Sequence, residues 1–273
     1  MAAAFPGAVA EVSSPAAVTL PLRLRSICRR ACRAARLATW CWVLASAVTA
    51  CGDNRYRNPP YFNWDSTAAV GAFDLDHLAG DDRGVRDAVD SVLGSDSVVL
   101  FYGHDPPRGT TYEAIEGLLD RAAHDGLAVF TFADLAAGTA RRAGICLSFD
   151  DNDVDAWYAM RELLARHHAH VTFFVTEYAQ LTPDQRARLH ALYADGHSIE
   201  AHGVHHLAAT AYIAAHGLQA YIDDEVQPSI DILRADGFAP VAYAHPGGAH
   251  TRQLDEALAG RVRFVRSISG RPR

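Results

Sequence analysis

The chain has 273 residues, 49% of them hydrophobic, so it can bury a core large enough for one domain of roughly 200 residues with extensions. Its formal net charge is -7, and the first fifty residues hold six arginines and one glutamate. Without those seven residues, the totals of 25 basic and 32 acidic side chains leave a net charge of -12. Such an acidic chain lacks the positive surface that binds nucleic-acid phosphates, so no nucleic-acid partner is expected.

The N-terminal residues have the features of an export signal. A basic stretch from Arg29 to Arg36 precedes a short apolar segment, and small residues lead up to Cys51. This order predicts a secretory signal, and the apolar segment is too short to span a bilayer comfortably. The sequence Val48-Thr49-Ala50-Cys51 resembles a bacterial lipobox, which predicts a signal peptide over residues 1–51 and lipidation of Cys51. We therefore expect an exported, membrane-anchored lipoprotein of the bacterial cell envelope. A secreted protein with a plain signal peptide and a protein with an uncleaved anchor are the alternatives.

Two further segments follow this leader. Residues 52–92 are expected to form a tether and lead-in, because Asn58–Asp65 combines turn-forming residues with aromatic side chains that follow no period. Residues 93–273 are expected to form one catalytic domain.

From about residue 97, apolar runs alternate with segments whose apolar residues recur at helical spacing. The runs predict seven strands, near residues 97, 127, 144, 171, 198, 240 and 262. The segments between them predict helices over Thr110–His124, Val154–His167, Pro183–Ala194, Leu218–Ala235 and about Thr251–Ala259. Continuous apolar strands between amphipathic helices are typical of a parallel sheet covered by helices. We expect an α/β fold, a distorted (β/α) barrel of about seven parallel strands, with an open doubly wound sheet as the alternative.

Polar residues follow several of these strands, where catalytic residues of such folds collect. The segments concerned are His104-Asp105, Asp150 to Asp153, Glu200 to His206 and His245 to Gly248. Asp150 and Asp151 repel each other unless a cation lies between them or one is protonated. His202 and His206 are four residues apart, a spacing that can bring two imidazoles to one side. With one carboxylate they suit a divalent metal, Zn²⁺ or another first-row ion.

Three motifs resemble those of a known family. Ser148-Phe149-Asp150-Asp151, His202-Gly203-Val204-His205-His206 and Ala244-His245-Pro246-Gly247-Gly248 are similar, in order and spacing, to the leading motifs of the polysaccharide deacetylases. These are the NodB-like carbohydrate esterases of family 4, and the resemblance covers roughly residues 97–266. It implies a distorted (β/α) barrel, with Asp150 as the general base and Asp151, His202 and His206 as the metal ligands.

The resemblance also has departures. The family's late Leu-His-Asp motif is absent after residue 250, whereas Val98 to Asp105 lies before the Asp-Asp motif. This order resembles the permuted relatives that deacetylate poly-N-acetylglucosamine, so His104 is the candidate acid; a structural histidine at the barrel rim is the alternative. Gly203 stands where the family usually has serine or threonine. Gly247 stands in a motif that lacks the usual aromatic, although its backbone N–H can still serve an oxyanion.

Three functions are therefore weighed. The first is a metal-dependent deacetylase that hydrolyses N-acetyl groups of a cell-envelope or extracellular polysaccharide. The second is an amidohydrolase on a non-sugar amide, which the missing aromatic favours. The third is a non-catalytic envelope protein that retains the barrel for binding, although a site without catalysis has no physical reason to keep two repelling carboxylates.

Overall fold

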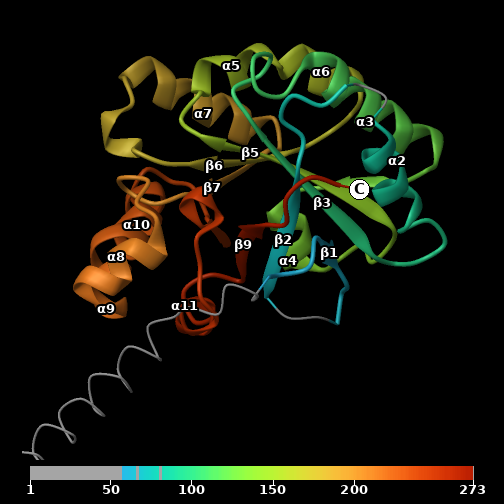
Figure 1. Ribbon diagram of the computed structural model, residues 1–273. Helices are drawn as coiled ribbons and strands as arrows, with labels where there is room; N and C mark the ends of the chain where they lie inside the picture. The colour runs from blue at the N-terminus through green and yellow to red at the C-terminus, as the bar shows by residue number, and fades with distance from the viewer. Residues whose placement is uncertain (1–56, 66–67, 80–81, 273) are drawn as a thin grey trace, which may run out of the picture. The chain divides into compact units, whose positions relative to one another are not determined.

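Seven parallel strands close into a ring in the computed structural model, which describes residues 57–65, 68–79 and 82–272 (Figure 1). The ring strands are β2 (Ala69–Asp74), β3 (Val98–His104), β5 (Gly144–Asp151), β6 (Thr172–Val175), β7 (Ser198–Ala201), β8 (Ala242–Ala244) and β9 (Phe264–Ile268). Their order is β3-β2-β9-β8-β7-β6-β5, and β5 pairs with β3 along the whole strand, from Val98↔Gly144 to His104↔Asp150. The expected (β/α) barrel of seven parallel strands is confirmed, and the open sheet is excluded.

One member of the ring differs from the sequence prediction. The strand expected near residue 127 is β4 (Ala128–Phe130), which pairs with β5 but lies outside the ring. The seventh strand of the ring is instead β2, which lies between β3 and β9. β2 falls in the range 52–92 that was expected to be a tether and lead-in, and so do β1 (Tyr61–Phe62) and α2 (Arg83–Asp90). β2 is rich in small residues, and Gly71 allows a close approach, because a Cβ there would lie 2.5 Å from the carbonyl oxygen of Asn58.

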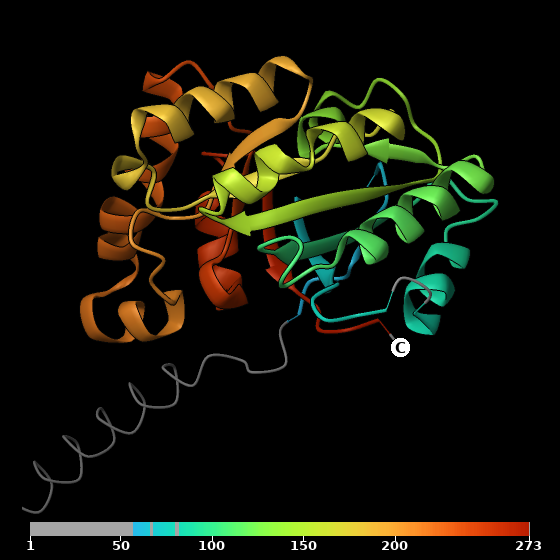
Figure 2. The same cartoon turned by 90° about the horizontal axis from the view of Figure 1, so that it is seen from above.

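Helices lie around the outside of the strands (Figures 1 and 2). After α2 they are α3 (Tyr112–His124), α4 (Phe132–Ala137), α5 (Val154–Ala159), α6 (Arg161–Arg166), α7 (Pro183–Ala194), α8 (Ala209–His216), α9 (Leu218–Tyr221), α10 (Gln227–Ala235) and α11 (Arg252–Leu258). Threonine side chains cap the first turns of α3, α4, α7 and α11. Two predicted helices are divided: Met160 separates α5 from α6, and a π-helical turn, η2 (Ile222–Val226), separates α9 from α10. No helix in the described ranges is long and apolar enough to cross a membrane.

The core has two layers because successive residues of a strand point to opposite faces. Outward residues of the ring, such as Ile145, Leu147 and Phe149, pack with the helices in one cluster. Inward residues form a second cluster with Phe62 of β1 and Phe132, the first residue of α4, at the N-terminal end of the barrel. Aromatic side chains therefore fill this end, which leaves the polar groups to the C-terminal end.

Candidate active site

The inward alternation of the strands brings titratable groups together at the C-terminal end of the barrel. His104 ends β3, Asp150 stands next to the end of β5, and Arg266 lies on β9. The neighbouring residue Asp151 ends β5 with a φ of 85°, which is uncommon for a residue other than glycine. The loop after β7 adds His202 and His206.

Asp151, His202 and His206 form a group that fits a metal ion. The Oδ1 atom of Asp151 lies 3.6 Å from Nε2 of His202 and 3.4 Å from Nε2 of His206. Ligand atoms around a tetrahedral ion with bonds of about 2.0–2.1 Å lie about 3.4 Å apart, so these distances suit Zn²⁺. Within the described residues, Asp151 Oδ1 is buried and accepts no hydrogen bond, which fits an atom reserved for a cation.

Hydrogen bonding orients one of these imidazoles. Nδ1 of His202 lies 3.0 Å from the carbonyl oxygen of Ala244, so it carries the proton and Nε2 keeps its lone pair toward Asp151. Burial raises the pKa of Asp151, but the neighbouring imidazoles, His202 first, outweigh it and the net shift is downward. Burial and the adjacent His202 lower the pKa of His206, which favours the neutral form that binds metals.

Asp150 lies beside this group but has different partners. Its Oδ1 atom accepts a hydrogen bond from Nη2 of Arg266, and its Oδ2 atom lies 4.0 Å from Nε2 of both His104 and His202. Arg266 is fully buried, with its guanidinium 5.0 Å from the ring centre of Tyr102. The sequence prediction did not include Arg266, although an arginine inside the apolar run Phe264–Ile268 is a signal that could have identified it.

His104 has a carboxylate partner that the sequence prediction also missed. Its Nδ1 atom lies 2.5 Å from Oδ2 of Asp76, and Oδ1 of Asp76 accepts hydrogen bonds from the His104 backbone N–H (2.9 Å) and the Thr110 hydroxyl (2.6 Å). The ring is thereby fixed with Nε2 facing Asp150. Burial lowers the pKa of His104, but the hydrogen bond with Asp76 and the charge of Asp150 outweigh it and raise the pKa to about 9.

Two other strand ends do not join this group. His245 is fully buried and its Nε2 atom lies 2.8 Å from Oδ1 of Asp255. Glu200 points into the barrel, where its carboxylate accepts hydrogen bonds from the backbone N–H groups of Val241 and Ala242, both at 2.7 Å. Gly247 lies in the turn η3 (Pro246–Gly248) after β8, exposed and with a φ of 58°.

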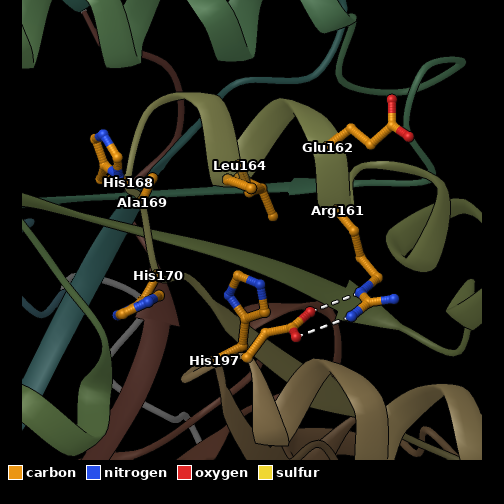
Figure 3. Close-up of a pocket in the computed structure, with 9 residues that line it drawn as sticks. Arg161, Glu162, Leu164, His168, Ala169, His170 and His197 are labelled. Atoms are coloured by element: carbon orange, nitrogen blue, oxygen red, sulfur yellow. Dashed lines mark hydrogen bonds and ion pairs between the residues drawn. The ribbon is translucent and has the colours of Figure 1, made fainter.

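A separate pocket of about 580 Å³ lies at the other end of the strands (Figure 3). Its lining includes His170 and His197, which precede β6 and β7, and the ion pair of Arg161 with Asp195 (2.6 and 2.8 Å). Parallel strands place residues that precede them at the end opposite to residues that follow them. This pocket is therefore distinct from the Asp151 group.

Comparisons with known proteins find one family model and several solved structures that this chain resembles. The family model of the polysaccharide deacetylases matches residues 137–260. The structure of IcaB from Ammonifex degensii is 18% identical, with a TM-score of 0.52, and the match covers 64% of this chain and 86% of that chain. A de-N-acetylase from Aggregatibacter actinomycetemcomitans is 14% identical, with a TM-score of 0.49, over 64% of this chain and 94% of that chain. A search of curated protein sequences finds no match. The likeness to IcaB supports the barrel fold.

Proposed function

We propose that this chain is a metal-dependent deacetylase of N-acetylated polysaccharide, and the match of residues 137–260 to the polysaccharide deacetylase family supports this proposal. The same match supports the expected enzyme class, a hydrolase of non-peptide carbon–nitrogen bonds. One observation carries the metal dependence: the buried Oδ1 atom of Asp151 accepts no hydrogen bond from the described residues and faces two imidazoles at 3.4 and 3.6 Å.

Asp151, His202 and His206 would hold the metal, for which Zn²⁺ is the first choice and other first-row ions are possible. A divalent ion bound there supplies Lewis-acid chemistry and lowers the pKa of water. The three protein ligands leave room for a further ligand, as in catalytic rather than structural sites.

Asp150 is proposed as the general base that accepts the proton of the attacking water. Its Oδ1 atom is held by Arg266, so Oδ2 keeps a fixed direction and remains available for proton transfer. The carboxylate is 2% exposed, which limits competition from bulk water for the same proton.

His104 is proposed as the general acid that protonates the leaving nitrogen. Asp76 holds Nδ1, so the proton to be donated is on Nε2, which faces Asp150. With a pKa of about 9 the imidazole is protonated at neutral pH, as an acid must be. The backbone N–H of Gly247 is proposed to stabilise the oxyanion, a role that needs no side chain.

The substrate proposed is an N-acetylated polysaccharide or oligosaccharide of the cell envelope or extracellular matrix. One observation favours the second candidate, an amidohydrolase on a non-sugar amide. A Cβ atom at Gly247 would have nothing within 4 Å, so open space lies where the family usually has an aromatic residue. The Oδ1 atom of Asp151 has no hydrogen-bond partner among the described residues, which disfavours the third candidate, a non-catalytic binding protein, because an unused buried acceptor destabilises the fold.

Export and lipid anchoring are proposed from the N-terminal sequence alone, since residues 1–51 lie outside the described residues. In a bacterial host the chain should incorporate labelled fatty acid, and Cys51→Ser should remove the label. A chain that is exported without any label points to the plain signal peptide instead.

The deacetylase proposal is tested by measuring acetate released from N-acetylglucosamine oligomers by purified protein, with and without a chelator. Release is expected to require the metal, and Asp150→Asn should keep the metal but release at least about 100-fold less acetate. The matched control is Asp155→Asn, an exposed carboxylate on α5, which should leave the rate unchanged. Acetate release by Asp150→Asn at the rate of the parent protein contradicts the assignment of the base.

A further inference from the structure

A buried glutamate stands behind the metal-ligand loop. Glu225 lies in the π-helical turn η2, and π-helical turns inside helices occur frequently at functional sites. Its neighbours Asp223 and Asp224 are exposed, whereas Glu225 is fully buried. A buried carboxylate requires hydrogen-bond donors to offset the loss of water.

The donors come from the two residues on either side of His206. The backbone N–H of His205 lies 3.1 and 3.0 Å from the two carboxylate oxygens of Glu225, and the backbone N–H of Leu207 lies 2.9 Å from Oε1. The carboxylate therefore bridges the backbone on both sides of His206, whose imidazole faces Asp151.

The backbone enclosed by this bridge is in an uncommon conformation. His206 has a φ of 55°, in the left-handed region, which costs on the order of 1 kcal/mol or more for a residue with a Cβ and persists only when its surroundings enforce it. The N–H bonds to Glu225 and the hydrogen bond from the Tyr221 hydroxyl to the Leu207 carbonyl (3.1 Å) provide that enforcement.

Gly203 makes room for the carboxylate. It has a φ of 84°, and a Cβ at this position would lie 2.4 Å from Oε1 of Glu225. The serine or threonine usual at this position in the family would occupy the same space. The Thr176 hydroxyl donates to the Gly203 carbonyl (3.1 Å), so this part of the loop is held without a side chain at 203.

We infer that Glu225 is a positioning residue that acts through His206: its carboxylate holds the His205–Leu207 backbone so that the imidazole meets the metal. The inference rests on the proposed function, because it takes Asp151, His202 and His206 as the ligands. It assigns Glu225 no contact with substrate or metal.

The test compares Glu225→Gln with Asp223→Asn in the purified protein. Glutamine replaces one acceptor oxygen by an NH₂ group that faces the His205 N–H, so part of the bridge is lost. Zn²⁺ affinity, measured by competition with a chromophoric chelator, is expected to fall by about 10- to 100-fold in Glu225→Gln. Asp223→Asn removes the same charge from the exposed side of the same turn and should change the affinity by less than twofold.

A double-mutant cycle separates this effect from a general loss of structure. In a His206→Ala background the bridge has no imidazole to position, so adding Glu225→Gln should weaken Zn²⁺ binding by less than about twofold. An equal loss in both backgrounds, or no loss in the parent background, overturns the inference. If His206→Ala itself leaves Zn²⁺ affinity unchanged, the ligand assignment fails instead, so the two failures are distinguishable.

Glu225→Asp provides a second variant if Glu225→Gln does not fold. Aspartate keeps the charge but is one methylene shorter, so it cannot reach both N–H groups from the same backbone. Its Zn²⁺ affinity should fall at least about fivefold, on the same scale as other lost orienting bonds. Full affinity in this variant means that charge rather than the hydrogen-bonded bridge matters, which overturns the inference.

Discussion

The described part of the chain contains two groups of the same composition, each with two histidines and one aspartate, that differ in spacing. In the first group, Oδ1 of Asp151 lies 3.4 and 3.6 Å from the imidazole nitrogens of His206 and His202. In the second group, Asp255 lies 2.8 Å from Nε2 of His245 and 3.0 Å from Nδ1 of His250. The shorter distances are those of hydrogen bonds, and the longer ones are those of atoms that share an ion.

The carboxylates of the two groups also differ in their hydrogen-bond donors. The Asn58 amide donates to Oδ2 of Asp255 at 3.1 Å, so both oxygens of that carboxylate have donors, whereas Oδ1 of Asp151 has none among the described residues. Burial raises the pKa of Asp255, but the hydrogen bonds to His245 and His250 outweigh it and hold the pKa far below its usual range. Composition alone therefore does not identify a metal site; an acceptor left without a donor does.

The largest expected effect tests which of the two histidine–aspartate groups binds the metal. Asp151→Ala should reduce bound metal from about one ion per chain to a small fraction, because one of the three proposed protein ligands is lost. Acetate release should fall by at least about 1000-fold as a result. Asp255→Ala should keep the metal. Metal content is measured by atomic emission after dialysis. Metal lost from Asp255→Ala and retained in Asp151→Ala would exchange the roles of the two groups.

A second substitution tests the structural role of the other group. Asp255→Asn should lower the free energy of unfolding by about 3 kcal/mol, since buried donors on His245 and His250 lose a charged acceptor. Urea unfolding of the metal-free protein measures this change. The exposed carboxylate of Asp231, which accepts from Gln227, gives the matched control Asp231→Asn with an expected change below about 0.5 kcal/mol. Unchanged stability in Asp255→Asn contradicts the structural reading.

Much of this arrangement is predictable from local sequence. Apolar runs identify β3, β5, β6, β8 and most of β9, because buried parallel strands are largely apolar. β2 escapes this rule because its residues Ala69, Gly71 and Ala72 are small, and the close approach that makes glycine necessary at 71 becomes visible only in three dimensions. The predicted number of ring strands, seven, is therefore correct, but one predicted member is wrong. β4 was counted in the ring in place of β2.

Some residues of the candidate site were predictable from the sequence, and others were not. Asp150, Asp151, His202 and His206 stand in recognisable motifs, so their types and spacing predict a shared location. Asp76 acts on His104 from the turn after β2, and Arg266 acts on Asp150 from β9, so the partners are 28 and 116 residues apart in the chain. Such pairings depend on ring closure, which no local pattern encodes. His245 was expected at the rim, but Asp255 from α11 holds it in the interior.

A third prediction compares the two histidine–aspartate hydrogen bonds. His245 is buried with Asp255, whereas the His104 side chain is 33% exposed and bonded to Asp76. Asp76→Asn should lower acetate release by about 30-fold at pH 8, because loss of the carboxylate lowers the pKa of His104 and depletes the acid form. Protonated His104 is lost as pH rises through its pKa of about 9, so the alkaline limb of the kcat/KM profile should move to lower pH. A reduced rate with an unmoved alkaline limb contradicts the role of His104 as the acid.

The smallest expected effect concerns His197, a buried histidine outside both histidine–aspartate groups. His197 is buried at the opposite end of the barrel, and its Nδ1 atom accepts a hydrogen bond from the Val171 N–H at 3.0 Å, so the ring is neutral. Burial, followed by the charge of His170, lowers its pKa from 6.5 to about 4.

Because the unfolded chain binds this proton more readily, the contribution of His197 to stability is complete above about pH 6.5 and is lost as pH falls toward 4. Between pH 7.5 and 5.5 the parent protein should lose about 1 kcal/mol more unfolding free energy than His197→Gln. The exposed His168, changed to glutamine as the control, should leave the pH dependence as it is. Equal pH dependence in the parent and His197→Gln would mean that this imidazole is protonated in the folded state, so that burial with the Val171 hydrogen bond does not keep it neutral.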